Sequence, residues 1–415
     1  MRATTVLAMI LALKKTRIRG TEVGEEGLTL DVAPITRVPR CSGCLRRQRR
    51  VYDRRERTWR HLDLAGMRLD LRYPIRRVDC GRCGVTTELV PWAEADSRFT
   101  TEFEAATAYL AQRADQTTVS RLMRVSWEAV GRIAQRVVRR LGVLDRLDGL
   151  THIGIDELSY RKHHRYVTVV IDHRRSRVVW CGEGKSAETL MKFFAELGPE
   201  RAAKLQEVTI DMSEAYRQAV AAHAPNATLT FDRFHVQRLV HDALDEVRRA
   251  EVREVSDPED RRALKKTRWA LHKNPWNLTR REEAKIADVQ RTNRRLYRGY
   301  LLKETLSEAL YTPQEHVAER KLHDWIAWAV RSRLAPFARA ARTIRDHLDG
   351  VMAYVRSGLS NGRAEGLNGK IRTITRRAYG FHSVRSLIGL IFLCCSGLTL
   401  NPVRHYPLRS APTTT

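Results

Sequence analysis

The chain of 415 residues is long enough for two or three domains. Its 75 lysines and arginines outnumber its 48 aspartates and glutamates, which leaves a formal charge of +27. Such an excess favours a nucleic-acid partner over a solvated basic surface or a membrane-surface protein, because each phosphate contact by a basic side chain releases a condensed counterion. The longest apolar run, from Ser386, is shorter than the ~20 residues of a membrane-spanning helix, so we expect a buried core segment and no membrane partner.

The cysteines indicate a reducing compartment. Seven of them in a chain of this length do not form a disulfide framework, and four lie in two CxxC pairs. The apolar stretch near the N-terminus lacks a small-residue cleavage site and is followed directly by Lys14 and Lys15, which argues against an export signal. We therefore expect a cytoplasmic protein.

Residues 21–90 predict short strands and turns around the two CxxC pairs. The runs GLTLDV and MRLDLRYPIRRVDC alternate apolar and polar residues with period two. Cys41, Cys44, Cys80 and Cys83 complete a closed tetrahedral zinc site, and an ion with four protein ligands is expected to be structural. The weaker alternatives are four unrelated thiols or a redox CxxC, which would not need a second pair.

The segment QTTVSRLMRVSWEAVGRIAQRVVRRLG predicts a helix-turn-helix. A short helix, Thr117–Met123, is followed by a turn and by a longer helix from Trp127, with Ser126 as its N-cap. The second helix of such a motif enters the major groove of DNA, and the surrounding arginines favour this role over a plain helical hairpin. The expected core residues are Val119, Leu122, Val125, Val130, Ile133 and Val137. The candidate DNA-contacting residues are Arg121, Arg124, Trp127 and Arg132.

An α/β domain is predicted from Thr151 to Asp232. The runs THIGID, YVTVVID, RVVWCG, EVTID and ATLTFD alternate with amphipathic stretches, in the order hairpin, helix, strand, helix, strand. Asp156 and Asp211 each end an apolar run, which would hold a carboxylate rigidly at the edge of a sheet. Residues 234–350 are almost wholly helical in pattern and strongly charged.

Polar residues return on one helical face in the segment SNGRAEGLNGKIR. Asn361, Glu365, Asn368 and Arg372 are spaced four, three and four apart, so they share one face. The apolar flanks favour a shared site over a solvated helix face. Together with the two aspartates, Glu365 suits Mg²⁺, which prefers hard oxygen ligands. Two such ions about 3.5–4 Å apart stabilise the attacking and leaving oxygens of an in-line phosphoryl displacement.

These motifs resemble the ISL3 family of bacterial insertion-sequence transposases, which use an Asp-Asp-Glu triad on an RNase H-like fold. The likeness extends from about Leu7 to Tyr406 and includes the zinc knuckles, the helix-turn-helix and the segments IGIDELSYRKHHRYVTVVID, VTIDMSEAY, FDRFHV, RWALHKNPWNLT and AEGLNGKIR. The resemblance implies that Asp156, Asp211 and Glu365 bind two catalytic magnesium ions. It also implies a helical insertion between the second aspartate and the glutamate.

Two positions require comment: one leaves two candidates for the second triad residue, and the other differs from the family pattern. Asp232, in FDRFHV, also ends a strand and competes with Asp211 for the second triad position. Asp211 is preferred because RNase H-like folds place this aspartate after the fourth strand, which would be LQEVTID. The first knuckle reads CSGCL, where the family tends to have glycine after the second cysteine, so Leu45 is expected to loosen that turn. The auxiliary candidates are His235, Asn361 and Asn368.

Basic and aromatic side chains in the catalytic region suggest further DNA contacts. Trp269 and Trp276, among lysines and arginines, are candidates for stacking on an unpaired base. The preferred interpretation is that they pack in the core of the insertion. The residues that suit phosphates beside the cut are Lys370, Arg372, Arg376 and Arg377.

The sequence therefore predicts an α/β protein with a zinc-binding β-rich module (1–98), a helix-turn-helix domain (99–148), an RNase H-like catalytic domain (149–400) and a tail (401–415). A helical insertion is expected at about 250–345. The first two modules are expected to bind the terminal inverted repeats of an element in double-stranded DNA, and the third to cleave and transfer its 3′ ends. Family logic implies a homodimer or larger assembly at the bacterial nucleoid.

Two other functions compete with a transposase. One is a transposase-derived regulator that binds DNA without catalysis, but it has no reason to keep three carboxylates. The other is an RNase H-like nuclease or junction resolvase, which would not need a long helical insertion or two DNA-reading modules.

Overall fold

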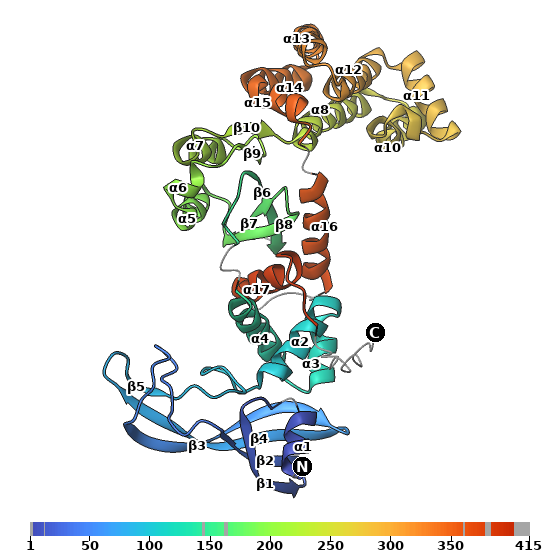
Figure 1. Ribbon diagram of the computed structural model, residues 1–415. Helices are drawn as coiled ribbons and strands as arrows, with labels where there is room; N and C mark the ends of the chain where they lie inside the picture. Colours follow the sequence, from blue (N-terminus) through green and yellow to red (C-terminus); the bar gives the residue numbers. More distant parts are fainter. Residues whose placement is uncertain are drawn as a thin grey trace, which may run out of the picture. The chain divides into compact units, whose positions relative to one another are not determined.

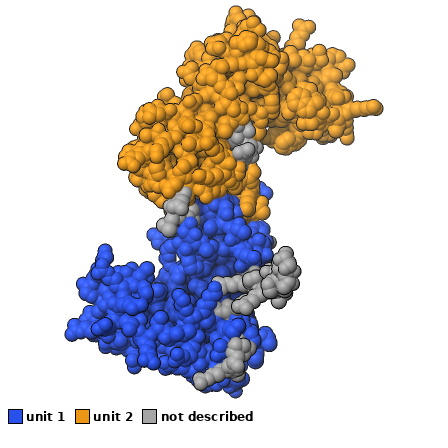
Figure 2. All heavy atoms as spheres, viewed as in Figure 1, with its two compact units in different colours: residues 1–143, 376–415 blue, residues 144–375 orange. Residues whose placement is uncertain are grey.

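The computed structural model describes residues 3–11, 13–142, 146–161, 165–359, 362–377 and 383–401, without the side chains of residues 3, 6, 161 and 362–365 (Figure 1). The chain forms two compact units, one of residues 1–143 and 376–415 and one of residues 144–375 (Figure 2). Within the described ranges, no helix combines the length and apolar character that a membrane crossing requires.

The N-terminal part of the first unit is a five-stranded sheet built on one long hairpin. Strand order is β1-β2-β4-β3, and β5 pairs with the end of β4. The core contains Trp59 and Trp92, whose rings meet edge to face with centroids 5.6 Å apart. The elements are α1 (Ala3–Ile10), β1 (Thr16–Gly24), β2 (Gly27–Pro34), β3 (Val51–Leu64), β4 (Met67–Cys80) and β5 (Gly84–Thr87).

The expectation of short strands in this module is wrong, because β3 and β4 have 14 residues each. Strand β3 is the last strand of the sheet and pairs along its length with β4, and its Arg60 also forms an isolated bridge with Phe99. Half of its side chains are exposed, so its sequence VYDRRERTWRHLDL carries charge where a strand with one buried face would show alternating apolar residues.

The predicted helix-turn-helix is present as α2 (Thr101–Arg113), α3 (Gln116–Met123) and α4 (Trp127–Arg140). Ser126 is the N-cap of α4, and its hydroxyl accepts a hydrogen bond from the backbone N–H of Ala129 at 3.2 Å. The prediction of Leu122 as a core residue is wrong, since its exposed fraction is 62%. The inner face of α3 carries Gln116 and Val119 and turns position 122 outward. The other predicted core residues are buried, or partly buried at position 125: Val119, Val125, Val130, Ile133 and Val137.

Helix α17 (Val384–Cys395) packs against α4 within the same unit. A Cβ added at Gly131 would lie 3.1 Å from the hydroxyl of Ser386, and one added at Gly389 would lie 2.8 Å from Cγ of Gln135, so glycines permit the close approach. The prediction that the apolar run from Ser386 is buried is confirmed by Leu387, Leu390, Ile391, Leu393 and Cys395. The end of the expected catalytic segment therefore contributes to the helix-turn-helix unit.

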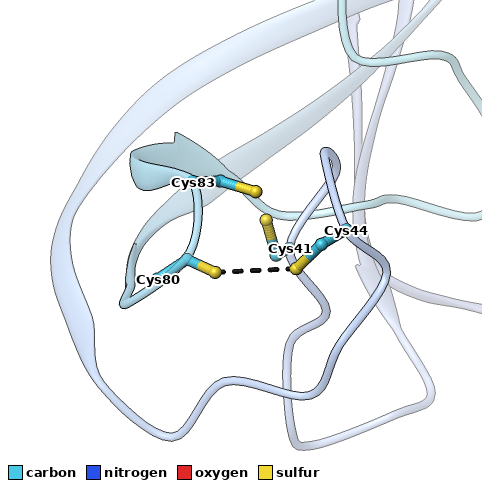
Figure 3. Close-up of side chains that lie close together, drawn as sticks. All are labelled: Cys41, Cys44, Cys80 and Cys83. Carbon is cyan, nitrogen blue, oxygen red and sulfur yellow. Dashed lines mark hydrogen bonds between the residues drawn. The ribbon is translucent and has the colours of Figure 1, made fainter.

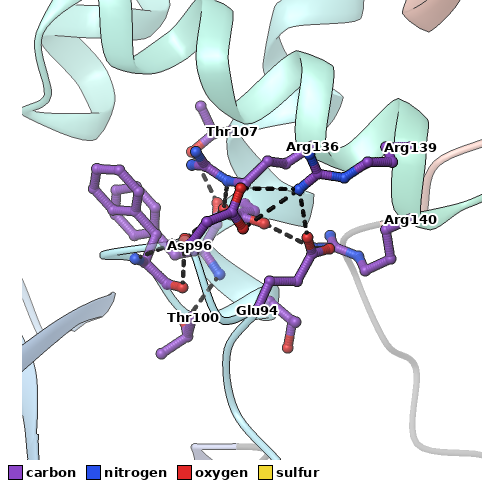
Figure 4. A network of polar contacts seen from close by, with 12 residues as sticks. Glu94, Asp96, Thr100, Thr107, Arg136, Arg139 and Arg140 are labelled. Carbon is purple, nitrogen blue, oxygen red and sulfur yellow. Dashed lines mark hydrogen bonds and ion pairs between the residues drawn. The ribbon is translucent and has the colours of Figure 1, made fainter. Parts of the chain in front are cut away.

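A buried ion-pair network joins α2, α4 and the segment before α2 (Figure 4). The carboxylate of Glu104 is fully buried and accepts hydrogen bonds from Arg136 Nε at 2.6 Å and Arg140 Nη1 at 2.7 Å. The hydroxyl of Ser97 donates to the same carboxylate at 2.6 Å. At the rim of the network, Asp96 pairs with an exposed Arg139.

The second unit contains a five-stranded mixed sheet of order β10-β9-β6-β7-β8. The strands β6, β7 and β8 are antiparallel neighbours, whereas β9 and β10 run parallel to β6. The predicted order of hairpin, helix, strand, helix, strand is confirmed, and LQEVTID supplies the fourth strand in chain order. The elements are β6 (His152–Arg161), β7 (Arg165–Asp172), β8 (Arg177–Glu183), α5 (Ala187–Leu197), α6 (Pro199–Ala202), β9 (Glu207–Ile210), α7 (Glu214–His223) and β10 (Thr228–Phe231).

A long helical segment follows β10, as predicted, and shares a hydrophobic core with the sheet. Trp325 is buried in this core, and its indole N–H donates to the carbonyl of Leu302 at 2.7 Å. Trp269 and Trp276 are 68% and 72% exposed, so the core interpretation of these two residues is wrong. The elements are α8 (Arg233–Glu254), α9 (Pro258–Lys265), α10 (Arg268–His272), η1 (Pro275–Asn277), α11 (Arg280–Thr292), α12 (Arg294–Tyr311), α13 (Glu315–Arg331), α14 (Ala335–Asp346), α15 (Leu348–Ser357) and α16 (Gly362–Arg377).

Removal of the buried carboxylate is expected to destabilise the first unit. The Glu104→Ala variant leaves two arginines without their buried partner, which costs about 3–5 kcal/mol. The Asp96→Ala variant removes an exposed ion pair from the same network and is expected to cost about 1 kcal/mol or less. The free energy of unfolding in urea measures both, and equal losses would contradict the assignment of Glu104 as the centre of the network.

Candidate functional site

Three aspartates lie at one edge of the mixed sheet. Asp211 directly follows β9, and Asp232 directly follows β10. The prediction that Asp156 ends its strand is wrong, because β6 continues to Arg161 as the partner of β7. Pairing between β6 and β9 ends at Gly154, however, so Asp156 lies just beyond the parallel half of the sheet. All three carboxylates therefore occupy the carboxyl edge of the parallel strands.

The charges of Asp211 and Asp232 act on the carboxyl group of Asp156. Burial raises the pKa of Asp156, and the charges of Asp232 and Asp211 raise this pKa further. The backbone N–H of Glu157, which donates to the Asp156 carboxylate at 2.7 Å, and the charge of His235 act in the opposite direction. A cation at this edge would relieve the repulsion between the carboxylates.

Asp211 and Asp232 have different surroundings. Asp232 is buried, with an exposed fraction of 3%, and is the N-cap of α8: its carboxylate accepts from the backbone N–H of Phe234 at 3.2 Å. His235 Nε2 lies 3.9 Å from the same carboxylate. Asp211 is only partly buried and accepts from the backbone N–H of Ser213 at 3.0 Å.

Helix α16 reaches this edge through Asn368. This side chain is 2% exposed, and its amide N–H donates to the carboxylate of Asp156. Its amide oxygen is buried and accepts no hydrogen bond from any described residue. A buried polar oxygen without a partner is costly, and a bound water or ion would satisfy it.

Glu157 is an acidic neighbour that the sequence interpretation missed. Burial raises the pKa of its carboxyl group, and the nearby charge of Asp211 raises this pKa further. A hydrogen-bond interaction with the buried Tyr216 lowers this pKa. The residue directly follows Asp156, and this adjacency was the available signal.

The remaining candidates of the C-terminal segment are described only in part. Asn361 and the side chain of Glu365 lie outside the described residues. Among the side chains that the structure describes, only the four cysteines form a group of metal-binding residues whose ligand atoms all lie within 4.8 Å of one another.

These cysteines converge where the loop after β2 meets the turn between β4 and β5 (Figure 3). The sulfurs of Cys44 and Cys80 are 3.6 Å apart, and Cys41 and Cys80 are buried. The backbone N–H groups of Arg82 and Cys83 lower the pKa of Cys80 to about 7, which favours the thiolate that binds metal. Burial and the neighbouring thiols raise the pKa of Cys83 to about 12. The spacing and the four soft ligands fit a closed, structural zinc site.

Leu45 occupies a backbone position that favours glycine. Its φ is 60°, in the left-handed region, and its side chain is exposed. Gly43, two residues earlier, is needed for a different reason, since a Cβ there would lie 3.2 Å from the sulfur of Cys83. The first knuckle thus has a glycine at position 43, where there is little space for a side chain. It has a leucine at position 45, where the left-handed backbone favours glycine.

The candidate DNA-contacting residues of the helix-turn-helix have different environments. Arg121 and Arg132 are exposed. Arg124 has a φ of 52° at the end of α3, and its guanidinium binds the carboxylate of Asp63 and donates to the carbonyl of Gly66. The turn of the motif is therefore attached to the tip of the β3–β4 hairpin. Trp127 is partly buried.

The basic residues of α16 are mostly exposed. Lys370, Arg372 and Arg376 face solvent, whereas Arg377 donates to the carbonyl of Arg113 at 3.0 Å. The first three are therefore accessible to a phosphate backbone.

Comparison with known proteins matches these modules in chain order. Residues 37–83 match a family model described as the zinc-finger of transposase IS204/IS1001/IS1096/IS1165, and residues 88–138 match the helix-turn-helix domain of transposase family ISL3. Residues 153–391 match an ISL3 model described as transposase.

Two relatives are similar over most of their length. The chain is 38% identical to a transposase for insertion sequence element IS1557 from Mycobacterium tuberculosis, over 92% of this chain and 93% of the relative. It is 30% identical to a transposase for insertion sequence element IS1001 from Bordetella parapertussis, over 88% of this chain and 91% of the relative.

Glycine at position 45 is expected to strengthen the zinc site. The Leu45→Gly variant removes a left-handed strain of about 1 kcal/mol, which corresponds to roughly fivefold tighter zinc binding. Competition with a chromophoric chelator measures the affinity. The Val85→Gly variant is the control, because Val85 is exposed in β5 without a positive φ and glycine weakens a strand. Weaker zinc binding by both variants would contradict the strain at Leu45.

Proposed function

Because this chain belongs to the ISL3 family of insertion-sequence transposases, with a DNA-binding helix-turn-helix, we propose that Asp156, Asp211 and Glu365 form its catalytic triad. The triad would hold two magnesium ions that support DNA cleavage and strand transfer. The family resemblance predicted from the motifs is confirmed by these comparisons.

The observation that carries this proposal is the hydrogen bond from Asn368 to Asp156. It joins α16, the helix that contains position 365, to the strand that contains the first aspartate. Positions 365 and 368 are three residues apart and so belong to the same face of the helix. This contact supports a site composed of β6, β9 and α16.

The residues at this edge suit a hard divalent cation. They offer carboxylate oxygens from Asp156 and Asp211 and the unpartnered amide oxygen of Asn368, which are the ligand types that Mg²⁺ prefers, directly or through water. Bound there, a pair of magnesium ions would stabilise the attacking and leaving oxygens of an in-line displacement. Asp156 and Asp211 would hold the ions, and the amide of Asn368 would keep Asp156 in one orientation.

Asp211 is preferred over Asp232 as the second triad member. The carboxylate of Asp232 is buried and caps α8, so its role in the fold is already defined. Asp211 is more accessible and adjoins the strand that pairs with β6. His235 would support the catalytic site indirectly, through its contact with the carboxylate of Asp232.

The DNA substrate would be engaged by two groups of residues. Arg121 and Arg132 on the helix-turn-helix would read the terminal inverted repeats of an element. The exposed Lys370, Arg372 and Arg376 of α16 would contact phosphates near the cut. A homodimer or larger assembly would hold the two ends together.

Strand transfer with a labelled end fragment separates this proposal from its rivals. Joined products are expected. Binding without cleavage would indicate a regulator, and cleavage without joining would indicate a nuclease.

The triad is tested by single carboxylate-to-amide substitutions. The Asp156→Asn and Asp211→Asn variants should bind end fragments normally but lose about 10³-fold in cleavage rate, since a metal ligand provides several kcal/mol of transition-state stabilisation. Asparagine is as good an N-cap as aspartate, so Asp232→Asn should fold and retain cleavage. Asp324→Asn, at an exposed position, is the surface control. Cleavage by Asp211→Asn together with its loss in Asp232→Asn would reverse the assignment.

The role of Asn368 is tested through the metal requirement. The Asn368→Ala variant should raise the magnesium concentration for half-maximal cleavage by about 10–100-fold, as expected when the partner of a metal ligand is removed. Thr373→Ala, an exposed change on the same helix, should leave the requirement unchanged. An unchanged magnesium requirement in Asn368→Ala would exclude a positioning role.

A further inference from the structure

Several exposed arginines lie in and beside the two zinc knuckles. Four follow the first CxxC pair in the segment RRQRR, and one lies inside the second pair. All five side chains are exposed. These residues, called the knuckle arginines below, are Arg46, Arg47, Arg49, Arg50 and Arg82.

The four-cysteine site holds the backbone that carries these arginines. The N–H of Cys41 donates to the carbonyl of Arg46 at 2.9 Å, and the N–H of Asp79 donates to the carbonyl of Arg50 at 3.3 Å. Between them, the side-chain amide of Gln48 donates to the sulfur of Cys80 at 3.3 Å. A metal bound by the cysteines would therefore order the whole arginine segment.

The charge of the knuckle arginines is largely uncompensated within the described part of the chain. Arg50 has one carboxylate partner there, Asp79, at 3.9 Å, and both side chains are well exposed, so the pair is weak. The other four have no carboxylate oxygen within 4.0 Å among the described residues. A zinc ion with four thiolates carries a net charge of −2, which is less than five positive charges. Like charges gathered on one fixed loop repel one another unless a polyanion neutralises them.

The knuckle arginines lie at the opposite end of the β3–β4 hairpin from the helix-turn-helix contact. Arg124 binds the hairpin near its tip, at Asp63 and Gly66, whereas the arginine segment joins the hairpin at Val51. Asp63 is twelve residues after Val51 in β3, which corresponds to about 40 Å along the strand. One turn of B-DNA is about 34–36 Å long. The spacing therefore matches about one helical turn.

We propose that the knuckle arginines form a second DNA-binding surface, which contacts phosphates about one helical turn from the base pairs read by α4. Arginines on a loop around a metal site position the duplex through its backbone and carry no base specificity. The surface would extend the bound site beyond the helix-turn-helix contact and would depend on zinc for its shape. This inference rests on DNA binding by the family and is independent of the catalytic triad.

The test compares two triple variants of the full-length, zinc-loaded chain. Arg46→Ala/Arg47→Ala/Arg49→Ala removes three knuckle arginines. Arg17→Ala/Arg19→Ala/Arg37→Ala removes three exposed arginines of the same unit outside the knuckles and is the charge-matched control. Binding to an element-end fragment is measured without magnesium over a range of salt concentrations, so the result does not depend on catalysis.

The knuckle variant should bind more weakly and show a salt dependence shallower by about 2.7 in the log–log slope, which is about 0.9 for each of three lost phosphate contacts. Its footprint should lose protection about one turn from the α4 contact. Lysine at the same three positions should restore most of the slope. The control variant should keep the wild-type slope and footprint.

Three outcomes would overturn the proposal. One is an unchanged slope in the knuckle variant. Another is an equal loss in both variants, which would show a general effect of net charge. The third is a knuckle variant that loses zinc but binds DNA normally, which would show that the arginines serve only to balance the charge of the thiolates. Zinc content is therefore measured on every variant.

Discussion

The end of the pairing between β6 and β9 determines where the acidic residues of the second unit meet. The two strands are hydrogen-bonded only as far as Gly154 and Thr209. At Gly154 there is no room for a side chain, since a Cβ would lie 2.6 Å from the ring of His173. Beyond this point the strands are no longer linked, and Asp156 and Asp211 emerge at the same edge. Like charges at one edge repel one another, and a cation bound there would relieve this cost.

In the first unit, a buried charge is stabilised by partners within the protein. The buried carboxylate of Glu104 is tolerated because Arg136, Arg140 and Ser97 all donate to it. The zinc knuckles likewise bring together four thiols that suit a structural metal ion. Both the ion-pair network and the cysteine cluster join residues that are distant in sequence.

Features with a local cause were predictable, and features with a distant cause were not. The N-cap at Ser126 and the two CxxC turns follow from residue types a few positions apart. Leu122 is exposed and Trp276 is exposed because neighbouring elements bury other faces, which periodicity in one segment does not reveal. The length of β3 was missed because pairing with β4, not its own side chains, makes it a strand.

The sequence by itself determined the order of modules, the cysteine ligands, the alternation of strands and helices, and the candidate acidic residues, because each depends on spacing along the chain. Tertiary structure decided which of these residues become neighbours. It placed Asp156 inside a strand but beside Asp211 and Asp232, brought Asn368 to Asp156, and packed α17 on α4. The physical reason is that contacts between distant segments arise from sheet pairing and side-chain packing, which depend on the whole core and not on any one stretch of sequence.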